Sequence, residues 1–483
     1  MMESKSIGLL RTFSEKEFKE FGLFLNSPFH NKDKVLLSLY GAIKKFYPRF
    51  ESSWVTKEKI FAKIYPGKKF NDARMRNLLS NLLKRAEEFL VICKVKGDRF
   101  KVNSLLAEEF VRRDQRKLFE KKYDKLLLSM EGEIIHDRSY YERKNLLGLI
   151  ELDHKNRYEK SDVKIDELKL EIYDSLRIYF LISAMYLETE ISNSYLDRFS
   201  YGRNPEERKE LERYLDVEAE QHNDIIYVKY YYNMYKLGRT QERKHYRELR
   251  DIIRGHYSKL NEIDKRNIFT ALTNYCYYAA NKGETDLQRD HFELYRENVD
   301  RGYYRMGKYM THITYFNTVI TGLEVKEFKW VDEFIENYIS ELEEQRRDNA
   351  YSFCRALYFY HINNFDGALE MASKVVSDEM TYKHQLKSLY LKIYYDMNEI
   401  EPFYSNIDGY KHFINSERYV TAPTKPVFLN YINFAKKLFD IKNRIDEREY
   451  DFVKLKEEVV NEKAMINKPW LLQKIREIET SII

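Results

Sequence analysis

Between Gly67 and Glu401 the sequence contains a single proline, Pro205, so little in this long stretch interrupts a helix. Large side chains recur there three or four residues apart, as in the tyrosine cluster that runs from Tyr227 to Tyr235. This spacing is typical of the buried face of a helix. Helices that follow one another over such a length are expected to stack as a repeat array, in which each repeat packs mainly on its neighbours.

The composition agrees with an all-α protein. Hydrophobic residues make up 43% of the chain and charged residues 33%, while glycine (16) and proline (8) are scarce for 483 residues. The 41 tyrosines are expected mainly in the core, where a ring fills space and its hydroxyl reaches water or a carbonyl; the alternative is stacking on single-stranded bases. The sequence therefore predicts an irregular tetratricopeptide-like helical-repeat array, an α-solenoid, preceded by a small helical N-terminal module.

The N-terminal module is expected to cover residues 1–103. Three prolines separate four short helices there. Ser14 and Glu17 form a capping-box pattern at the start of the first helix. The fourth helix is capped by Asn71 or Asp72 and carries an unbroken apolar stripe up to Leu90.

A short segment after the fourth helix has a different period. From Lys94 to Val102, polar and apolar residues alternate on both sides of the pair Gly97–Asp98. Alternation around a two-residue turn is typical of a β-hairpin. The alternative is a helix-to-helix loop in which Val95 and Phe100 are tucked inward.

The repeat array is expected to cover residues 104–483, with the clearest repeats at 350–415. Small and large residues occur there with the spacing of a tetratricopeptide helical hairpin. A similar pattern begins about 35 residues later, which is close to the length of one tetratricopeptide repeat. The tryptophan, glycine and closing proline of the class are mostly missing. The first repeat is carried by Ala356, Phe359, Phe365, Ala368 and Ala372, and the second by Leu391, Tyr394, Ile400, Phe403 and Ile407. A last helix that begins near Trp470 is expected to cap the array.

Three phrases resemble a family of uncharacterised bacterial all-helical, tetratricopeptide-like proteins. They run from Phe24 to Phe29, from Ile60 to Asp72, and from Lys468 to Leu472. The resemblance spans nearly the whole chain and implies a helical fold, but it brings no activity with it.

A second, local resemblance runs from Val55 to Phe89 and is to the winged helix of bacterial transcriptional activators, which precedes a tetratricopeptide-like domain. It implies that the helix from Asp72 to Leu90 is a recognition helix and that residues 94–102 form the wing. The chain departs from the winged-helix pattern at its start, because helices are predicted there in place of the strands that begin a winged helix. The connection from Pro66 to Asn71 is also longer than a helix-turn-helix turn.

Sequence motifs for catalysis are not found. The glycines never cluster into a phosphate-binding loop, and the eleven histidines show no ligand spacing. Cys93, Cys276 and Cys354 lie far apart and are expected to be buried thiols in a reducing compartment. The first eight residues lack a signal-peptide run, and the most apolar segment, 178–187, is about half the length needed to cross a bilayer. We therefore expect a cytoplasmic protein that is not an enzyme, uses no cofactor or metal and does not enter a membrane.

Positive charge is concentrated in the N-terminal module. Nine basic and two acidic residues lie between Trp54 and Arg85, although the net charge of the whole chain is only +5. A basic surface around an amphipathic helix suits phosphate contact, and asparagines on its outer face suit contact with base edges. The alternative is a solvated surface, or one that docks on acidic parts of the same chain. The candidate nucleic-acid contacts are Lys68, Lys69, Arg74, Arg76, Asn77, Asn81, Lys84, Lys96, Arg99 and Lys101.

Two functions are compatible with these observations. The first is a non-enzymatic helical-repeat scaffold that binds a protein or peptide on its concave surface. The alternative is a transcriptional regulator whose N-terminal module binds double-stranded DNA while the array senses or oligomerises. No motif in the sequence identifies the partner or the oligomeric state.

Overall fold

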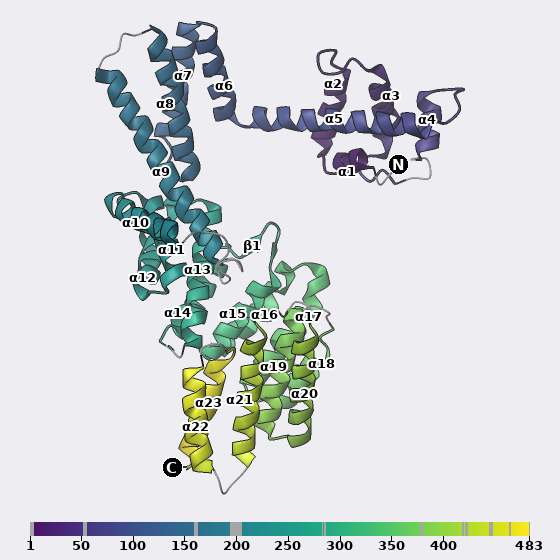
Figure 1. Cartoon of the computed structure of the whole chain (residues 1–483). Coiled ribbons are helices and arrows are strands. Elements are labelled where there is room, and N and C mark those ends of the chain that lie inside the picture. The colour runs from purple at the N-terminus through teal and green to yellow at the C-terminus, as the bar shows by residue number, and fades with distance from the viewer. Residues whose placement is uncertain are drawn as a thin grey trace. The chain divides into compact units, whose positions relative to one another are not determined.

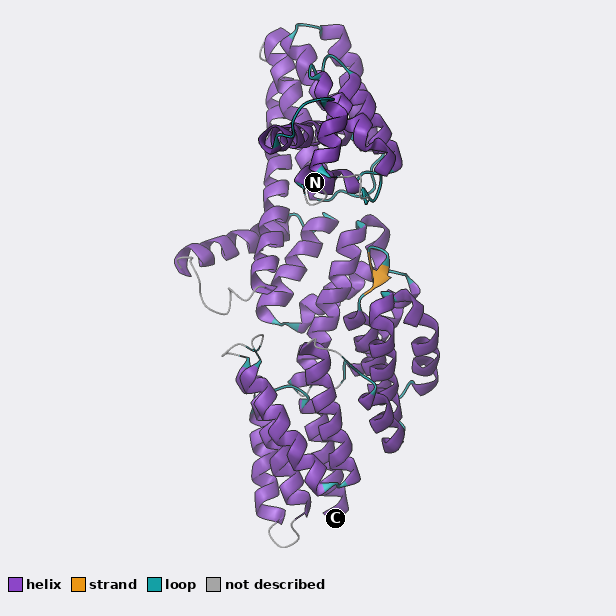
Figure 2. Cartoon of the chain, turned by 90° about the vertical axis from the view of Figure 1, so that its right-hand side faces the viewer, coloured by secondary structure: helices purple, strands orange, loops and turns teal. Residues whose placement is uncertain are grey.

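The computed structural model of the protein describes residues 4–51, 56–158, 163–193, 205–282, 284, 286–376, 380–417, 420, 424–443, 448–462 and 465–482. In these ranges the chain is helical apart from one small hairpin and the connections between helices (Figure 2). The predicted all-α class is confirmed. Among the described helices, none combines the length and the apolar character that a bilayer-spanning segment needs.

The chain divides into two compact units. Unit 1 contains Met1–Glu133 and Lys144–Ile172, and unit 2 contains residues 134–143 and Tyr173–Ile483. Residue 103, where we expected the N-terminal module to end, lies within a helix of unit 1. The helices labelled in Figure 1 that contribute to unit 1 are α1 (Lys5–Arg11), α2 (Glu15–Asn26), α3 (Lys34–Ile43), α4 (Lys57–Ile64), α5 (Asp72–Gly97), α6 (Arg99–Arg112), α7 (Arg116–Glu131), and parts of α8 (Arg138–Tyr158) and α9 (Val163–Asn193).

The first five helices enclose an aromatic core. The predicted capping box at the start of α2 is confirmed, since the Glu17 N–H donates to Ser14 Oγ (3.2 Å) and the Ser14 N–H donates to the Glu17 carboxylate (2.7 Å). Asn71 caps α5, whose Phe89 ring lies 5.5 Å from that of Phe21 on α2. The helix α1 was not predicted; Ile7 on it is fully buried in the same core.

Of the two alternatives for residues 94–102, the β-hairpin is wrong. The helix α5 continues to Gly97 and α6 begins at Arg99, so the alternative loop is reduced to the single residue Asp98. Asp98 ends one helix and starts the next, because its carboxylate accepts a hydrogen bond from the Lys101 N–H (3.0 Å). Unit 1 therefore has no wing at this position.

Unit 2 contains the start of α8, the end of α9 and the succession of helices that follows. Its one small hairpin pairs Arg305 with Met310 and Met306 with Tyr309, in antiparallel register. The elements are α10 (Pro205–Gln221), α11 (Ile226–Thr240), α12 (Arg243–His256), α13 (Glu262–Asn281), α14 (Gln288–Asp300), β1 (Arg305–Met306), β2 (Tyr309–Met310), α15 (His312–Glu324), α16 (Phe328–Tyr338), α17 (Glu344–His361), α18 (Phe365–Ser373), α19 (Met380–Met397), α20 (Ile400–Ser416), α21 (Lys425–Asn443), α22 (Arg448–Asn461) and α23 (Lys468–Ile482).

Consecutive helices of unit 2 pack as pairs, from α11 with α12 to α21 with α22. Some alternate helices also contact each other, namely α11 with α13, α15 with α17, α17 with α19, and α21 with α23. In the pair α17–α18, the fully buried Ala356 and Ala368 leave room for close approach. Phe403 and Ile407 are buried in the pair α19–α20. Both expected repeats at 350–415 thus consist of two packed helices.

The turns inside these two pairs are alike. Asn363 and Asn398 each adopt a left-handed backbone conformation, with φ of 60° and 59°. In both turns the next N–H bonds back to a carbonyl five residues earlier, from Asn364 to Phe359 (2.9 Å) and from Glu399 to Tyr394 (3.0 Å). This is the Schellman ending of a helix, which permits an abrupt reversal of the chain.

The helix α23 packs against more than its neighbours in sequence. Trp470 Nε1 donates to the Tyr360 hydroxyl on α17 (3.0 Å), which in turn donates to Asp396 on α19 (2.7 Å). Lys474 forms an ion pair with the same carboxylate (2.6 Å). The helix also contacts α13, α21 and α22. It therefore joins several pairs of the array rather than covering only the last one.

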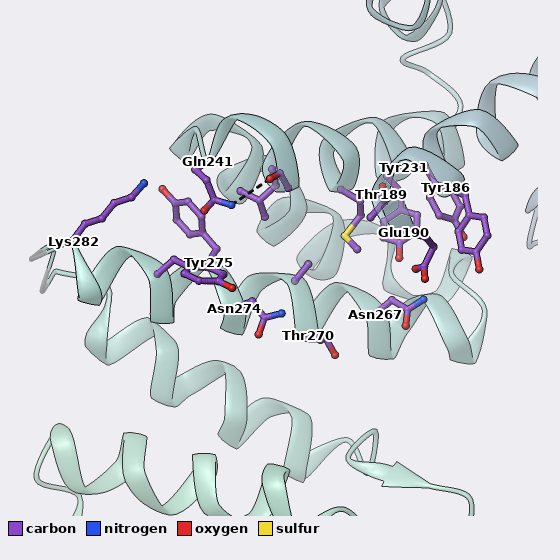
Figure 3. A pocket seen from close by; sticks show the side chains of 16 residues that line it. Tyr186, Thr189, Glu190, Tyr231, Gln241, Asn267, Thr270, Asn274, Tyr275 and Lys282 are labelled. Carbon is purple, nitrogen blue, oxygen red and sulfur yellow. Dashed lines mark hydrogen bonds between the residues drawn. The ribbon is translucent and has the colours of Figure 1, made fainter. Parts of the chain in front are cut away.

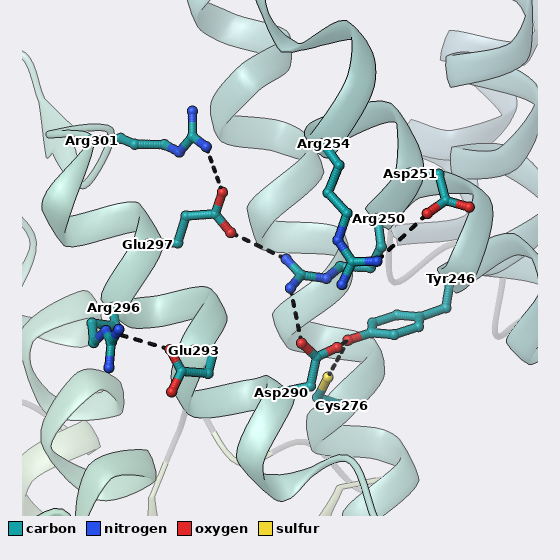
Figure 4. Close-up of polar contacts among 10 residues, drawn as sticks. All are labelled: Tyr246, Arg250, Asp251, Arg254, Cys276, Asp290, Glu293, Arg296, Glu297 and Arg301. Atoms are coloured by element: carbon teal, nitrogen blue, oxygen red, sulfur yellow. Dashed lines mark hydrogen bonds and ion pairs between the residues drawn. The ribbon is translucent and has the colours of Figure 1, made fainter.

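A largely buried arginine, Arg250, links α12 to α14 (Figure 4). The Arg250 guanidinium contacts Asp290 (2.9 Å) and Glu297 (3.3 Å) on α14. The Tyr246 hydroxyl donates to Asp290 as well, and Cys276 Sγ donates to that hydroxyl (3.5 Å). These contacts hold α12 and α14 together, and both helices pack against α13.

Candidate binding groove

The tyrosine cluster of α11 lies in the core, as its spacing predicts. Tyr227 and Tyr230 are fully buried, and Tyr235 is nearly so. Their rings pack with Tyr231 and with apolar residues of α9, α12 and α13. The buried rings anchor α11, and Tyr230 and Tyr231 also border a cavity beside it.

Hydrogen bonds fix α11 against the start of α13. The Tyr231 hydroxyl donates to Asp264 Oδ1 (2.7 Å), and the Asn261 N–H donates to the Tyr227 hydroxyl (2.8 Å). Asn261 also caps α13 by accepting from the Asp264 N–H (2.9 Å). Burial raises the pKa of the Asp264 carboxyl, while the Tyr231 hydrogen bond opposes this shift. The two helices are thus held in one arrangement at this end.

A cavity of about 650 Å³ lies between α9, α11 and α13 (Figure 3). Its lining includes residues along nearly the whole length of α11 and α13, from Tyr230 to Gln241 and from Asn267 to Lys282. The end of α9 contributes Tyr186. The cavity is therefore a groove that follows α13.

Polar side chains line the α13 side of the groove. Asn267, Thr270 and Asn274 recur three or four residues apart and so share one face of the helix. The Thr270 hydroxyl donates to the backbone carbonyl of Arg266 (3.2 Å). The amides of Asn267 and Asn274 form no hydrogen bond with any other residue that the structure describes. Both amides are free to contact a molecule in the groove.

A third amide, that of Gln241, lies opposite them at the end of α11 (Figure 3). Gln241 takes a left-handed conformation (φ 56°) and donates weakly from Nε2 to the Gly238 carbonyl (3.4 Å). Its Oε1 is buried and receives no hydrogen bond from the described residues. Since a buried acceptor without a donor destabilises by about 1–3 kcal/mol, this oxygen is suited to accept from a ligand.

The charged side chains of the groove lie toward its opposite ends (Figure 3). Lys282 lies just beyond the last turn of α13, and Glu190 lies near the end of α9. Both are exposed, and neither forms an ion pair with another described residue. A ligand with separated charges therefore has a preferred direction in the groove.

The chemistry available in the groove is that of binding. Its titratable groups are tyrosines, one carboxylate and one amine, and these do not form a nucleophile–base pair. In the described part of the chain, no group of histidine, cysteine and acidic side chains is arranged to hold a metal ion. The arrangement offers hydrogen bonds and aromatic contacts to a polar, elongated ligand.

The predicted nucleic-acid contacts lie in unit 1, and the structure brings part of the set together. Arg74, Asn77, Asn81 and Lys84 are exposed on one face of α5. The Arg74 guanidinium lies 4.2 Å above the Tyr65 ring. These four residues form a continuous surface, which we call the α5 face.

The rest of the predicted set is more scattered. Lys68 and Lys69 are exposed before α5 begins, and Arg76 pairs with Asp72 (2.9 Å). Lys96 lies twelve residues after Lys84 on the same helix, which places it about 18 Å further along. Arg99 and Lys101 are exposed in the first turn of α6. The wing that was expected to carry Lys96, Arg99 and Lys101 toward DNA does not form.

The groove residues were not found from the sequence. Asn267 and Asn274 resemble ordinary exposed positions of an amphipathic helix, and Gln241 resembles a turn residue. The available signal was the recurrence of uncharged polar residues on α13 opposite a face of Ile268, Phe269 and Leu272. That signal does not tell a groove from a solvated surface.

Comparison with known proteins adds no relative. No family model, curated protein or solved structure matches this chain.

Proposed function

We propose that the protein is a non-enzymatic scaffold of the tetratricopeptide-like type that binds another protein in the groove between α9, α11 and α13. The observation that carries this proposal is the groove of about 650 Å³ with three amide side chains in its lining. Its size lies within the range of ordinary ligand sites. The cytoplasm remains the expected location.

Two further observations support this function. The groove lies along alternate helices, which form the inner surface of helical-repeat arrays. The turns at Asn363 and Asn398 recur at about one repeat length, which favours an array of repeats. Such surfaces recognise partners by shape and hydrogen bonding.

Blocking the groove tests the proposal. Ala271 lines it, and Ala271→Arg places a long charged side chain there. We expect proteins that co-purify with the tagged full chain from the cells that produce it to be lost in this variant. Ala62→Arg, at an exposed helical alanine of unit 1, serves as the matched control and retains them. Recovery of the same proteins with both variants, or of none with the unaltered chain, contradicts the proposal.

The second candidate function is a regulator that binds double-stranded DNA through the α5 face. It is favoured by the exposure of Arg74 and Lys84 on one side of a helix, within a segment of nine basic and two acidic residues. On this proposal α5 makes the phosphate contacts without a wing. Asn77 and Asn81 lie between the two cations and suit contact with base edges.

A salt series tests the second candidate. Labelled duplex DNA is titrated with the full chain, and the Arg74→Glu, Lys84→Glu double variant is expected to bind weakly, with a salt slope smaller by about 2. The control is Lys117→Glu, Lys125→Glu on α7, where both lysines are exposed. Equal binding by the two double variants rules out the α5 face as the contact surface.

A further inference from the structure

We propose that the groove holds an extended peptide segment of about seven residues, which runs along α13 and is recognised mainly through its backbone. Its acidic end lies toward Lys282 and its basic end toward Glu190. This inference rests on the proposed scaffold function and specifies the kind of partner: an unfolded segment of another protein, rather than a helix or a folded surface.

The amides of α13 are far enough apart to bind different residues of an extended backbone. Asn267 and Asn274 are seven residues apart, which corresponds to about 10.5 Å along a helix. An extended chain covers the same distance in about three residues. An asparagine amide both donates and accepts, so each one can bond a peptide N–H and C=O together. From Asn267 to Lys282 the groove spans about 22 Å, or about seven extended residues.

The third amide points to the same ligand chemistry. Gln241 Oε1 is buried and receives no donor from the described residues. A backbone N–H on the side of the peptide that faces α11 supplies one. The three amides therefore line both sides of a strand that lies between α11 and α13.

A helical ligand does not use these groups. In a helix the backbone N–H and C=O groups are bonded to one another, so the amides of Asn267 and Asn274 would meet only side chains. An extended segment presents free backbone groups at both edges and side chains on alternate sides. Those side chains face the partly exposed rings of Tyr186 and Tyr278.

The charges of the groove give the segment a direction. Lys282 is exposed at one end and attracts a carboxylate, while Glu190 attracts a cation toward the other end. The remaining lining is uncharged, and its tyrosine hydroxyls are neutral. Reversing the order of charges in a peptide places like charges together at both ends, which weakens binding.

Fluorescence anisotropy with a labelled heptapeptide tests this inference on the full chain. The probe has arginine first, glutamate last, and alternating alanine and leucine between them. We expect saturable binding that weakens about thirtyfold in Asn267→Ala and in Asn274→Ala, since each variant loses two hydrogen bonds of about 1 kcal/mol each. The matched control is Asn156→Ala, at an exposed helical asparagine of unit 1, which binds as the unaltered chain does.

Two altered probes test the two parts of the inference separately. N-methylation at alternate peptide nitrogens removes backbone donors and is expected to abolish binding. A peptide with glutamate first and arginine last is expected to bind at least fivefold more weakly. Backbone recognition is refuted if the probe fails to bind at 1 mM (on the order of the weakest specific affinities), or if the methylated probe binds as well as the parent. Equal binding of the reversed probe refutes the assigned direction.

The binding experiments separate failure of the extended-peptide inference from failure of the scaffold function. A protein partner that is lost in Ala271→Arg but retained by Asn267→Ala and Asn274→Ala, and that the heptapeptide does not displace, supports a scaffold that binds a folded surface. In that case this inference fails and the scaffold function stands. If no protein partner depends on Ala271, the scaffold function itself fails.

Discussion

Replacing Arg250 with methionine tests how the helices behind the groove are held. Methionine preserves much of the aliphatic stem but removes the cation. The Arg250 side chain is 11% exposed, and its two carboxylate partners, Asp290 and Glu297, are 30% and 27% exposed (Figure 4). The substitution therefore leaves the half-buried Asp290 carboxylate without a cation, whereas Glu297 keeps its ion pair to Arg301 (2.8 Å).

The expected magnitude lies between two limits. Breaking a fully buried ion pair destabilises by about 3–5 kcal/mol, whereas an exposed pair contributes at most about 1 kcal/mol. Because the carboxylates keep nearly a third of their exposure, we expect about 2 kcal/mol. This corresponds to an equilibrium constant for local opening that is about thirtyfold larger, since each factor of ten is about 1.4 kcal/mol.

Hydrogen–deuterium exchange measured on peptides from residues 243–300 is the suitable assay, because a chain with two units need not unfold in one step. The matched control is Arg254→Met, which removes an exposed ion pair to Asp251 (3.7 Å) on the same helix. We expect exchange in the control to change less than about threefold. Equal effects of the two substitutions would refute the reasoning. Adding Asp290→Asn to Arg250→Met removes the orphaned charge and should restore part of the protection.

Two further predictions concern a buried base and the turns. Burial lowers the pKa of His291 to about 4, below the usual 6.5. The unfolded chain therefore binds the proton first on acidification, and stability is lost as the pH falls from 6.5 toward 4. Relative to His291→Gln, the unaltered chain should lose roughly 3 kcal/mol of unfolding free energy over that range. The Tm difference between the two proteins should therefore shrink as the pH falls. A Tm difference that stays constant with pH contradicts this prediction. Asn363→Ala and Asn398→Ala should each destabilise by about 1 kcal/mol and lower the Tm, whereas glycine at either position should be neutral or stabilising, because φ is near 60°. Equal Tm values for the alanine and glycine variants would show that backbone conformation does not limit stability there.

Local signals in the sequence predict much of the fold. The capping box of Ser14 and Glu17 and the apolar stripe of α5 are both confirmed, because caps and helical periodicity act within a few residues. The helix α1 has only seven residues, too few to show a period, and it is stabilised by burial of Ile7 and Leu10 in the core. Its existence depends on tertiary packing that a local pattern does not contain.

The error at residues 94–102 has a related cause. Alternation over a few residues does not distinguish a strand from a helix with half-buried positions, such as Val95 and Phe100. The single residue Asp98 is enough to end one helix and cap the next. The wing prediction relied on a two-residue turn that the chain does not use.

The groove is invisible to sequence analysis for a different reason. The amides of Asn267 and Asn274 are available to a ligand only because α9 and α11 leave space above that face of α13. The orphan acceptor of Gln241 likewise arises from a packing arrangement. A surface asparagine and a ligand-binding asparagine have the same local sequence, so only the arrangement of the helices separates them.

The position of α23 affects how unit 2 unfolds. In a linear repeat array each repeat contacts only its neighbours, so segments open nearly independently and repeats are gained or lost with little penalty. The bond between Trp470 and Tyr360 joins residues 110 positions apart and bypasses the pairs between them. Inserting or deleting one helical pair between these residues would move the tryptophan away from its acceptor. The stretch from α17 to α23 is therefore expected to unfold as one cooperative block.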